Sequence, residues 1–263
     1  FPARDPDIKK AIRGLFLPEE GDKWGSFDYS SQEPRLLVHF ASSLPDSMKH
    51  SVVDTIVDEY NNGDVDLHQM AADLAGISRK EAKVVNLGIM YGMGVGKLSN
   101  QLDISKDEAK DILELYNDKV PFVKQIATIA SQRATTEGQI RTILGRRCRF
   151  HLWEPRTFGY NKAMPLAEAE KEYGGLGMLR RAFTYKALNK LIQGSAADQT
   201  KKAMVDCYAE NFTPMLTVHD ELCFSVQNEE QAKRITEIME TGLPLNVPTR
   251  VDCEMGDNWG EAG

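Results

Sequence analysis

The chain alternates between short β-forming runs and longer stretches in which apolar residues recur with a helical period. Strands are predicted at 24–30, 215–218, 222–226 and about 247–254. The second and third of these runs are so close that they predict a hairpin. The predicted strands lie toward the two ends of the sequence, and the pattern between them is mainly helical.

Glycine, proline and aspartate positions divide the helical part. A helix is predicted around Pro34, since proline suits a first turn, and helices are predicted from Ser51 to about Ile129 with breaks near Gly63 and Asp103. The other expected elements are a hairpin at 138–149 around Gly145, a loop at 173–177, a helix at about 179–210 bent or interrupted near Gly194, and a helix at about 228–241. Strands flanking a helical middle indicate an α+β fold with a helical insertion.

The tip of the predicted C-terminal hairpin is chemically unusual. It carries His219-Asp220-Glu221, whereas hairpin tips commonly carry glycine, which tolerates positive φ. Two adjacent carboxylates repel each other, and one pKa rises unless a cation neutralises them. A bound metal ion is the simplest explanation, and it indicates phosphoryl chemistry.

Composition narrows the class of protein only slightly. The chain has 263 residues and a net charge of −7, which argues weakly against nucleic-acid binding because affinity depends on local clusters of cations. No apolar run approaches the roughly 18 residues of a membrane span, so no membrane partner is expected. The 4 cysteines form no CxxC pair, which suits reduced thiols and a cytoplasmic location, the host cytoplasm if the protein is encoded by a phage.

A helix that could bind a triphosphate is expected to start at Arg79, because residues 78–81 (Ser-Arg-Lys-Glu) have the spacing of a capping box. Side chains at four-residue intervals then share one broad face: Arg79, Lys83, Leu87 and Tyr91. Arg79 and Leu87 are about 12 Å apart along the axis, roughly the length of a nucleotide from γ-phosphate to base. Two cations suit phosphates and the apolar surface suits a base. A solvated basic face is the alternative.

Several segments resemble the motifs of family A DNA polymerases. Residues 79–92 resemble motif B, the fingers helix, residues 28–35 (Asp-Tyr-Ser-Ser-Gln-Glu-Pro-Arg) resemble motif A, and residues 218–221 (Val-His-Asp-Glu) resemble motif C. Residues 193–198 (Gln-Gly-Ser-Ala-Ala-Asp) match the run that precedes motif C, and residues 256–259 resemble the family's C-terminal end. All of them occur in the family's order, and the resemblance covers essentially the whole chain.

The resemblance implies an α+β architecture with a right-hand polymerase palm, made of an antiparallel sheet with helices, and a mainly helical fingers subdomain without a thumb. The expected division is palm with motif A at 1–40, fingers with motif B and a basic hairpin at 41–175, and palm with motif C and the last strand at 176–263. The implied enzyme is a DNA-directed DNA polymerase, a nucleotidyltransferase of DNA replication that adds dNTPs to a primer 3′ end and releases pyrophosphate.

By the same resemblance, Asp28 and Asp220 are the expected catalytic metal-binding carboxylates, because two-metal phosphoryl transfer needs carboxylates that bridge the ions. The backbone carbonyl of Tyr29 is a further expected ligand, and Glu221 is a ligand or an outer-shell acid. Mg²⁺ is the expected ion, two per site, because it prefers oxygen ligands, with Mn²⁺ as a substitute.

The resemblance also assigns the nucleotide pocket. Arg79 and Lys83 are expected to hold the triphosphate, and Lys83 to protonate the leaving pyrophosphate. Glu33 matches the steric gate that excludes a ribose 2′-hydroxyl, although a helix-terminal acid is the alternative. The remaining residues expected at the dNTP are Ser31, Gln32, His68, Leu87 and Tyr91.

The expected DNA partner is a primer–template. Gln193 and His219 are expected at the primer terminus, where they would read minor-groove acceptors common to all base pairs. Asn189 lies one helical turn before Gln193. Basic residues are the remaining expected contacts: Arg35, and Arg146 and Arg147 of a hairpin that also contains Arg141 and Arg149.

Two positions depart from the family pattern. Leu87 stands where the family usually carries Phe or Tyr, so the ring that controls dideoxynucleotide acceptance is absent. Tyr185 replaces an arginine common in the bacterial enzymes, and Lys186 or Arg181 is the candidate substitute. The short connection between His68 and Arg79 is closer to phage replicative enzymes.

The chain starts at Phe1, without an initiator Met, and the family's thumb and exonuclease segments would lie upstream. We therefore expect the missing segments in the same chain or in a separate partner chain, so that this chain acts as part of a split or longer polymerase. The alternatives are a non-catalytic module that binds DNA or a partner, and a single-subunit RNA polymerase, against which Glu33 argues.

Overall fold

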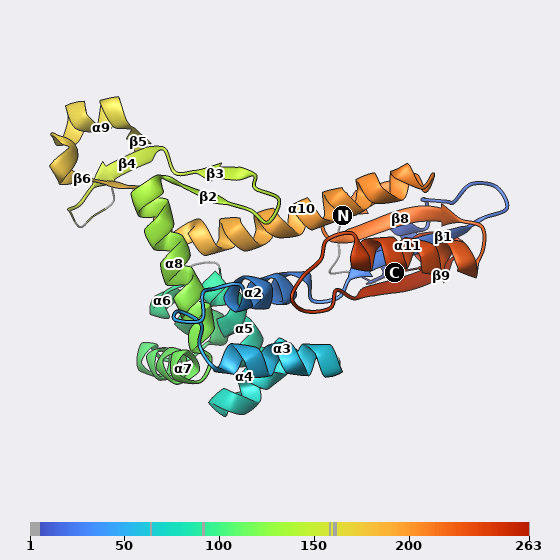
Figure 1. Cartoon of the computed structure of the whole chain (residues 1–263), viewed down its shortest axis with the longest axis horizontal. Helices are drawn as coiled ribbons and strands as arrows, with labels where there is room; N and C mark the ends of the chain where they lie inside the picture. The colour runs from blue at the N-terminus through green and yellow to red at the C-terminus, as the bar shows by residue number, and fades with distance from the viewer. Residues whose placement is uncertain (1–5, 64, 91–92, 158, 160–161, 263) are drawn as a thin grey trace. The chain divides into compact units, whose positions relative to one another are not determined.

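The computed structural model of the chain describes residues 6–63, 65–90, 93–157, 159 and 162–262. The chain folds as two compact units, one formed by the described residues up to Leu36 together with those from Ala196 onward, and the other by 37–195. We call them the sheet unit and the helical unit. Two helices have residues in both units, α2 (Gln32–Ser42) and α10 (Ala187–Ala209) (Figure 1).

The sheet unit is built on an antiparallel sheet with the strand order β7-β8-β1-β9. Its elements are α1 (Pro6–Arg13), β1 (Lys23–Tyr29), β7 (Leu216–Val218), β8 (Glu221–Val226), α11 (Glu229–Thr241) and β9 (Val251–Gly256). The hairpin predicted from the two β-forming runs is confirmed, because β7 and β8 pair with Val218 opposite Glu221.

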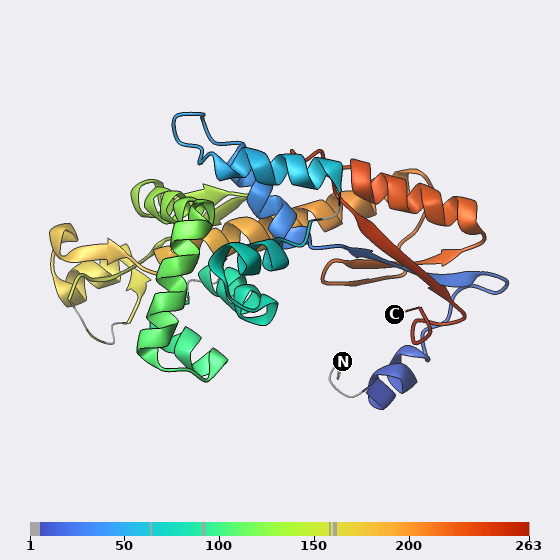
Figure 2. The same ribbon diagram turned by 90° about the horizontal axis from the view of Figure 1, so that it is seen from below.

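The two faces of this sheet differ because side chains alternate along each strand. One face is apolar and is covered by α11, as Figure 2 shows, and by the C-terminal part of α10. The buried cluster on this side consists of Phe27, Tyr29, Ala203, Cys207, Leu222, Phe224, Val226, Ala232, Ile235, Ile238, Met239 and Val251. On the opposite face Trp24 stacks on Trp259, with ring centroids 6.3 Å apart, and polar side chains lie beside them.

The helical unit contains most of the remaining helices and two small sheets. Its helices are α3 (Val52–Asn62), α4 (Leu67–Ala75), α5 (Arg79–Met90), α6 (Val95–Leu102), α7 (Lys106–Lys119), α8 (Pro121–Glu137) and α9 (Leu166–Tyr173), with 3₁₀ turns η1 (Leu176–Met178) and η2 (Thr184–Lys186). Its strands are β2 (Gln139–Arg141) paired with β3 (Arg147–Arg149), and β4 (Leu152–Pro155) paired with β5 (Met164–Pro165) and β6 (Leu179–Arg181). The prediction of an α+β fold is confirmed.

Local signals located several boundaries well. Helix α5 starts at Arg79, and its capping box is formed, since the Ser78 N–H donates to Glu81 Oε2 at 2.7 Å and the Glu81 N–H donates to Ser78 Oγ at 3.2 Å. Gly63 and Asp103 cap the ends of α3 and α6. The hairpin expected around Gly145 is present as β2 and β3.

The helix predicted at about 179–210 is present, but its predicted start and an interruption near Gly194 were wrong. Residues 179–181 form β6, and α10 begins at Ala187 and continues through Gly194. A Cβ at Gly194 would lie 2.6 Å from Cγ2 of Thr142, so this glycine lets the β2–β3 connection approach the helix closely. The last strand also begins later than predicted, at Val251.

We expect Gly194→Ala to lower the free energy of unfolding by roughly 1–3 kcal/mol, because the added methyl overlaps Thr142. Thr142→Ser removes the overlapping methyl and keeps the hydroxyl that accepts a hydrogen bond from the Arg146 N–H at 3.1 Å. In the Thr142→Ser background, Gly194→Ala should therefore cost much less or be stabilising, since alanine favours helix by about 1 kcal/mol. Urea unfolding of the four proteins tests this, and an equal cost in both backgrounds would contradict it.

Among the described residues, no helix combines the length and the apolar character needed to cross a bilayer. All four cysteines are free thiols, and Cys207 and Cys223 are buried.

Candidate functional site

Three carboxylates lie side by side across three neighbouring strands of the sheet unit. Asp28 of β1 is in register with Glu221 of β8 on one side and with Asp252 of β9 on the other. Side-chain alternation puts all three on the face opposite the apolar cluster. They line a cavity of about 310 Å³ together with Arg13, Ser26, Glu254 and Ala262.

Asp220 joins this row from the turn between β7 and β8. The Tyr29 N–H donates to the Asp220 carbonyl oxygen at 3.4 Å, which ties the turn to the end of β1. The pKa of Asp28 is raised to about 6, first because partial burial disfavours its charge and then because of the negative charges of Asp220, Glu221 and Asp252. Asp28 as a whole is nevertheless exposed to solvent. A cation placed here would relieve this repulsion.

His219 explains how this hairpin turns without glycine. Its φ is 57°, in the left-handed region that glycine usually occupies. A non-glycine residue there costs on the order of 1–3 kcal/mol and persists only when its surroundings hold it. Histidine is among the residues enriched in this conformation, so the sequence does contain a turn-compatible residue at the position where glycine was missing.

Glu221 is positioned by the protein itself. Its Oε1 accepts hydrogen bonds from the Ser26 hydroxyl and from Trp259 Nε1, the latter at 2.8 Å, and the Cys223 thiol lies 3.4 Å away. The Arg13 guanidinium carbon lies 4.3 Å from the centroid of the Trp259 ring. This shell fixes Glu221 without a metal, which fits an outer-shell position better than direct ligation.

The donor chemistry around Asp28 fits a hard divalent cation. Within the described ranges, no group of three or more His, Cys, Asp or Glu side chains is arranged to hold a metal. Mg²⁺ needs fewer protein ligands than that, because it commonly binds through one or two carboxylates and keeps several waters. Asp28 and the nearby Asp220, whose charge acts on Asp28, are the carboxylates of the kind that such a site needs.

The segment after β1 is held by contacts within the sheet unit. Gln32 is buried, and its Nε2 donates to the Ala196 carbonyl at 3.3 Å and to Thr200 Oγ1 at 3.2 Å. Arg35 is 3% exposed, and its Nε donates to the Ser30 carbonyl at 2.9 Å. A DNA contact by Arg35 would require it to leave this position. Ser31 is exposed at a φ of 53°, and Glu33 lies half-buried in the first turn of α2.

In the helical unit, Arg79 is paired with Asp66. Arg79 Nη2 and Nε each lie 2.6 Å from Asp66 Oδ2, while Asp66 Oδ1 caps α4 by accepting from the His68 N–H at 2.9 Å. Burial alone would raise the pKa of Asp66, but the hydrogen bonds from Arg79 and the helix N-terminus lower it. Arg79 is therefore oriented by a charged carboxylate and stays about half exposed.

His68 lies next to the cations of α5. Its Nδ1 is 2.9 Å from Asn86 Nδ2, and Asn86 Oδ1 accepts from the hydroxyl of the buried Tyr116. The pKa of His68 is lowered by burial and by the charges of Lys83 and Arg79, against the opposing charge of Asp66. The imidazole is therefore neutral near pH 7. With Asn86 as the donor to Nδ1, the proton of His68 lies on Nε2.

The remaining candidates of the helical unit lie on α5, α10 and the basic hairpin. Leu87 is half-buried on α5, and Tyr91 lies outside the described residues. Asn189 Nδ2 is buried with no hydrogen-bond acceptor in the part of the chain that the structure describes, and Gln193 is exposed one turn later. Arg146 Nη2 donates to the Gly194 carbonyl at 2.8 Å, and Arg147 is exposed on β3.

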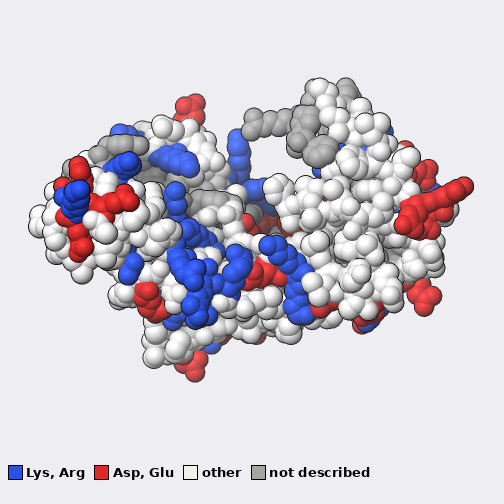
Figure 3. Space-filling view, turned by 90° about the horizontal axis from the view of Figure 1, so that it is seen from above, with Lys and Arg blue, Asp and Glu red and all other residues white. Residues whose placement is uncertain are grey.

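Charge is distributed unevenly despite the net value of −7. On the face shown in Figure 3, Lys and Arg side chains occur in groups, with acidic side chains beside them. Local cation density of this kind attracts polyanions whatever the total charge.

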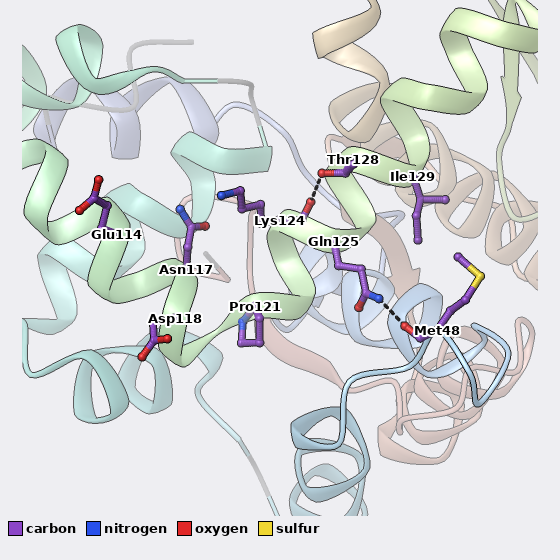
Figure 4. Close-up of a pocket in the computed structure, with 9 residues that line it drawn as sticks. All are labelled: Met48, Glu114, Asn117, Asp118, Pro121, Lys124, Gln125, Thr128 and Ile129. Carbon is purple, nitrogen blue, oxygen red and sulfur yellow. Dashed lines mark hydrogen bonds between the residues drawn. The ribbon is translucent and has the colours of Figure 1, made fainter.

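A larger hollow lies on the helical unit, and its lining includes none of the predicted site residues that the structure describes there. It measures about 610 Å³, is lined by residues of α7 and α8 and by Met48, and is crossed by the hydrogen bond from Gln125 to the Met48 carbonyl (Figure 4). Its lining offers Glu114, Asp118 and Lys124 but no cluster of nucleophiles or metal ligands. Size alone therefore does not make it the reactive site.

Comparison with known proteins decides the family. The model of DNA polymerase family A matches residues 1–261. The chain belongs to DNA polymerase family A. It is 36% identical over 299 residues to a DNA-directed DNA polymerase of Pseudomonas phage M6, covering 99% of this chain and 41% of that protein. It is 32% identical over 274 residues to DNA polymerase I of Bacillus caldotenax, covering 96% of this chain and 28% of that protein.

A solved structure supports the family fold. The POL domain of Pol1 from M. smegmatis, in complex with DNA primer-template and dNTP, matches with a TM-score of 0.73 and 28% identity, covering 96% of this chain and 43% of that chain. The resemblance predicted from the motifs is confirmed. The chain spans less than half the length of these family A relatives.

Several residues around the site were missed from the sequence. Asp252 and Glu254 were part of a predicted strand, but only the β1–β9 pairing shows that they share a face with Asp28. Asp66, the partner of Arg79, carried a visible signal, because an Asp before an apolar helix is a common N-cap. The contact of Asn86 with His68 and the hydrogen bond from Tyr116 to Asn86 depend on packing among α4, α5 and α7 and had no local signal.

Proposed function

We propose that the chain forms the catalytic part of a template-directed DNA polymerase, which extends a primer with dNTPs by two-metal-ion phosphoryl transfer. The observation that carries the proposal is the row of Asp28, Glu221 and Asp252 across three strands, with Asp220 at the adjoining turn. Like charges directly opposite each other in a sheet destabilise it, so a fold that keeps them there has a use for them. The relatives named as DNA polymerases support this reading.

Asp28, Asp220 and the Tyr29 carbonyl would hold the ions, and Glu221 would support them from the outer shell. When bound, two Mg²⁺ or Mn²⁺ ions would acidify the primer 3′-hydroxyl and neutralise the triphosphate. The raised pKa of Asp28 fits this role, because a carboxylate surrounded by other carboxylates gains from a cation.

Arg79, Lys83 and His68 would hold the triphosphate of the incoming nucleotide. Neutral His68 can donate from Nε2 to a phosphate oxygen, because Asn86 occupies Nδ1. Lys83 is exposed and can donate a proton to the leaving pyrophosphate. Arg79 would exchange or share its pairing with Asp66 when phosphate arrives. The further pocket residues that we propose are Ser31, Gln32, Leu87 and Tyr91. Gln32 is buried, so it would support the pocket by packing.

Primer–template contacts are proposed for Gln193, Asn189 and His219, with Arg146 and Arg147 near the template backbone. The unpaired, buried Asn189 amide supports this, since a buried donor without an acceptor is costly unless a ligand supplies one. For Arg35 we propose support of the Glu33 segment through its backbone bonds.

We expect Leu87→Tyr to increase acceptance of dideoxynucleotides, because a tyrosine hydroxyl next to the sugar can replace the missing 3′-hydroxyl interaction. A gain of about tenfold in the ratio of ddNTP to dNTP incorporation corresponds to one hydrogen bond of about 1.4 kcal/mol. Competitive incorporation on a primer–template measures it. Leu87→Met is the control, and an unchanged ratio in Leu87→Tyr would count against the pocket assignment.

Primer extension is the test of the proposed function, first with this chain alone and then with any segment encoded upstream of it. We expect extension with dNTPs and Mg²⁺ and none with rNTPs, because Glu33 would exclude the 2′-hydroxyl. Equal use of rNTPs would favour the RNA polymerase alternative. Binding of primer–template with no extension under any of these conditions would favour a non-catalytic module.

A further inference from the structure

The turn that leads into α10 presents two aromatic rings to solvent. Phe183 is 39% exposed and Tyr185 is 56% exposed. Both belong to the helical unit, next to and within η2, where chain direction changes between β6 and α10. Large exposed aromatics this close together are uncommon on a surface unless they serve in binding.

Phe183, one of these two exposed residues, has a strained backbone conformation. Phe183 has φ 60° and ψ 17°, the left-handed region, which is an outlier for a bulky residue. Such strain persists where the surroundings enforce it and clusters at binding sites. A glycine or asparagine would make the same turn without strain. The turn itself therefore does not require phenylalanine, which indicates that the aromatic ring has a use of its own.

Cations accompany the rings. Lys186 Nζ lies 5.0 Å from the centroid of Phe183 and 5.6 Å from that of Tyr185. One turn further along α10, Lys190 Nζ lies 4.4 Å over the ring of Phe150. Arg181, the other nearby cation, is engaged within the fold, since its Nη1 donates to the Phe150 carbonyl at 2.9 Å. The surface therefore combines exposed π faces with two lysines.

We propose that Phe183, Tyr185, Lys186 and Lys190 form a stacking platform for single-stranded DNA. Unpaired bases stack on aromatic side chains without regard to sequence, and flanking lysines attract the backbone. Tyr185 also lines an open hollow of about 610 Å³ along α8, whose other lining residues are Lys124, Ala127, Thr128, Ser131, Gln132, Thr135 and Thr136. The hollow gives the strand a continuing path. The inference extends the proposed function and rests on it in one respect, because the single strand is taken to be the unpaired template of that polymerase.

The test is binding of a fluorescein-labelled dT oligonucleotide by anisotropy, in EDTA and without primer or nucleotide, so that catalysis is irrelevant. We expect Tyr185→Ser and Phe183→Gly each to weaken binding by about 5- to 150-fold, the range of one lost base stack. Phe183→Gly should keep or raise Tm, because glycine accepts the positive φ. Lys186→Gln should lower the salt dependence by about one phosphate contact.

Matched controls separate the platform from general surface effects. Tyr208→Ser removes another exposed tyrosine, 67% exposed on α10, and Lys171→Gln removes another exposed lysine, on α9, and neither should change binding. A Tyr185→Trp variant should show fluorescence quenching when the oligonucleotide binds. The proposal is overturned if Tyr185→Ser and Phe183→Gly bind like wild type, or if the introduced tryptophan is not quenched. The assay contains neither free metal ion nor nucleotide, so failure of the polymerase proposal would leave this result untouched.

Discussion

Asp28→Asn and Asp220→Asn should each lower the rate of primer extension by at least about 1,000-fold, because loss of a bridging carboxylate removes several kcal/mol of charge stabilisation from the transition state. Both substitutions keep the shape of the side chain and remove its charge. Single-turnover extension with saturating dNTP and Mg²⁺ measures the effect.

The same substitutions should leave the metal-free fold intact or stabilise it. Asp28 faces three other carboxylates, so its replacement by a neutral amide removes repulsion. Asp252→Asn, in the same row, is the matched control, with a smaller expected loss because we assign no ligand role to it. If either Asp28→Asn or Asp220→Asn extended primers at the wild-type rate, the assignment would be contradicted. A drop in Tm large enough to explain the lost activity would contradict it too.

Titration of Asp28 should make the metal-free protein less stable as pH rises from about 4 to about 6. The pKa of Asp28 is raised from its usual value of 3.8 to about 6, so in this window the folded state holds a proton that the unfolded state has lost. The contribution is present below the unfolded pKa and is gone above the folded one. Urea unfolding in EDTA measures it, and Asp28→Asn should flatten this part of the profile while Asp58→Asn on α3 should not. Added Mg²⁺ should restore stability above pH 6.

Lys83→Ala and Arg79→Ala should each lower kcat/KM for the incoming dNTP by about 10- to 150-fold, which corresponds to the loss of one charge-assisted hydrogen bond of roughly 1.5–3 kcal/mol. Lys83 should show the larger effect on kcat if it also donates the proton to pyrophosphate. Steady-state kinetics on a fixed primer–template measures both constants.

Lys80→Ala is the control for the fingers helix. Lys80 is adjacent to Arg79 and is exposed, but it points about 100° away around the helix. An equal loss in Lys80→Ala would mean that α5 acts only through its general charge. An unaffected KM and kcat in Lys83→Ala would remove the triphosphate role altogether.

The sequence predicted those parts of the fold that have local causes. The capping box at residues 78–81 and the paired β runs at 215–226 specify their elements through neighbours in the chain, and both formed where expected. A helix break was wrongly predicted at Gly194, because helix propensity is only a weak local preference. The glycine is explained instead by the close approach of Thr142, which comes from a hairpin distant in the sequence.

The residues of the site also fall into those that local motifs predict and those that depend on long-range packing. Asp28 and Asp220 were identified through motifs, whereas Asp252 depends on a β1–β9 register that joins residues more than two hundred positions apart. Glu221 accepts a hydrogen bond from Trp259, His68 accepts one from Asn86, and Asn86 in turn accepts one from Tyr116. No pattern near these acceptors predicts their donors. Long-range packing decides these partners, so only the folded chain reveals them.

The central claim is that Asp28 and Asp220 share divalent ions, and anomalous diffraction tests it most directly. Crystals of the protein with primer–template and nucleotide, grown in Mn²⁺, should show anomalous peaks within about 2.3 Å of carboxylate oxygens of both residues, a hard-cation ligand distance. Manganese peaks that contact neither carboxylate, in crystals where nucleotide is bound, would contradict the account.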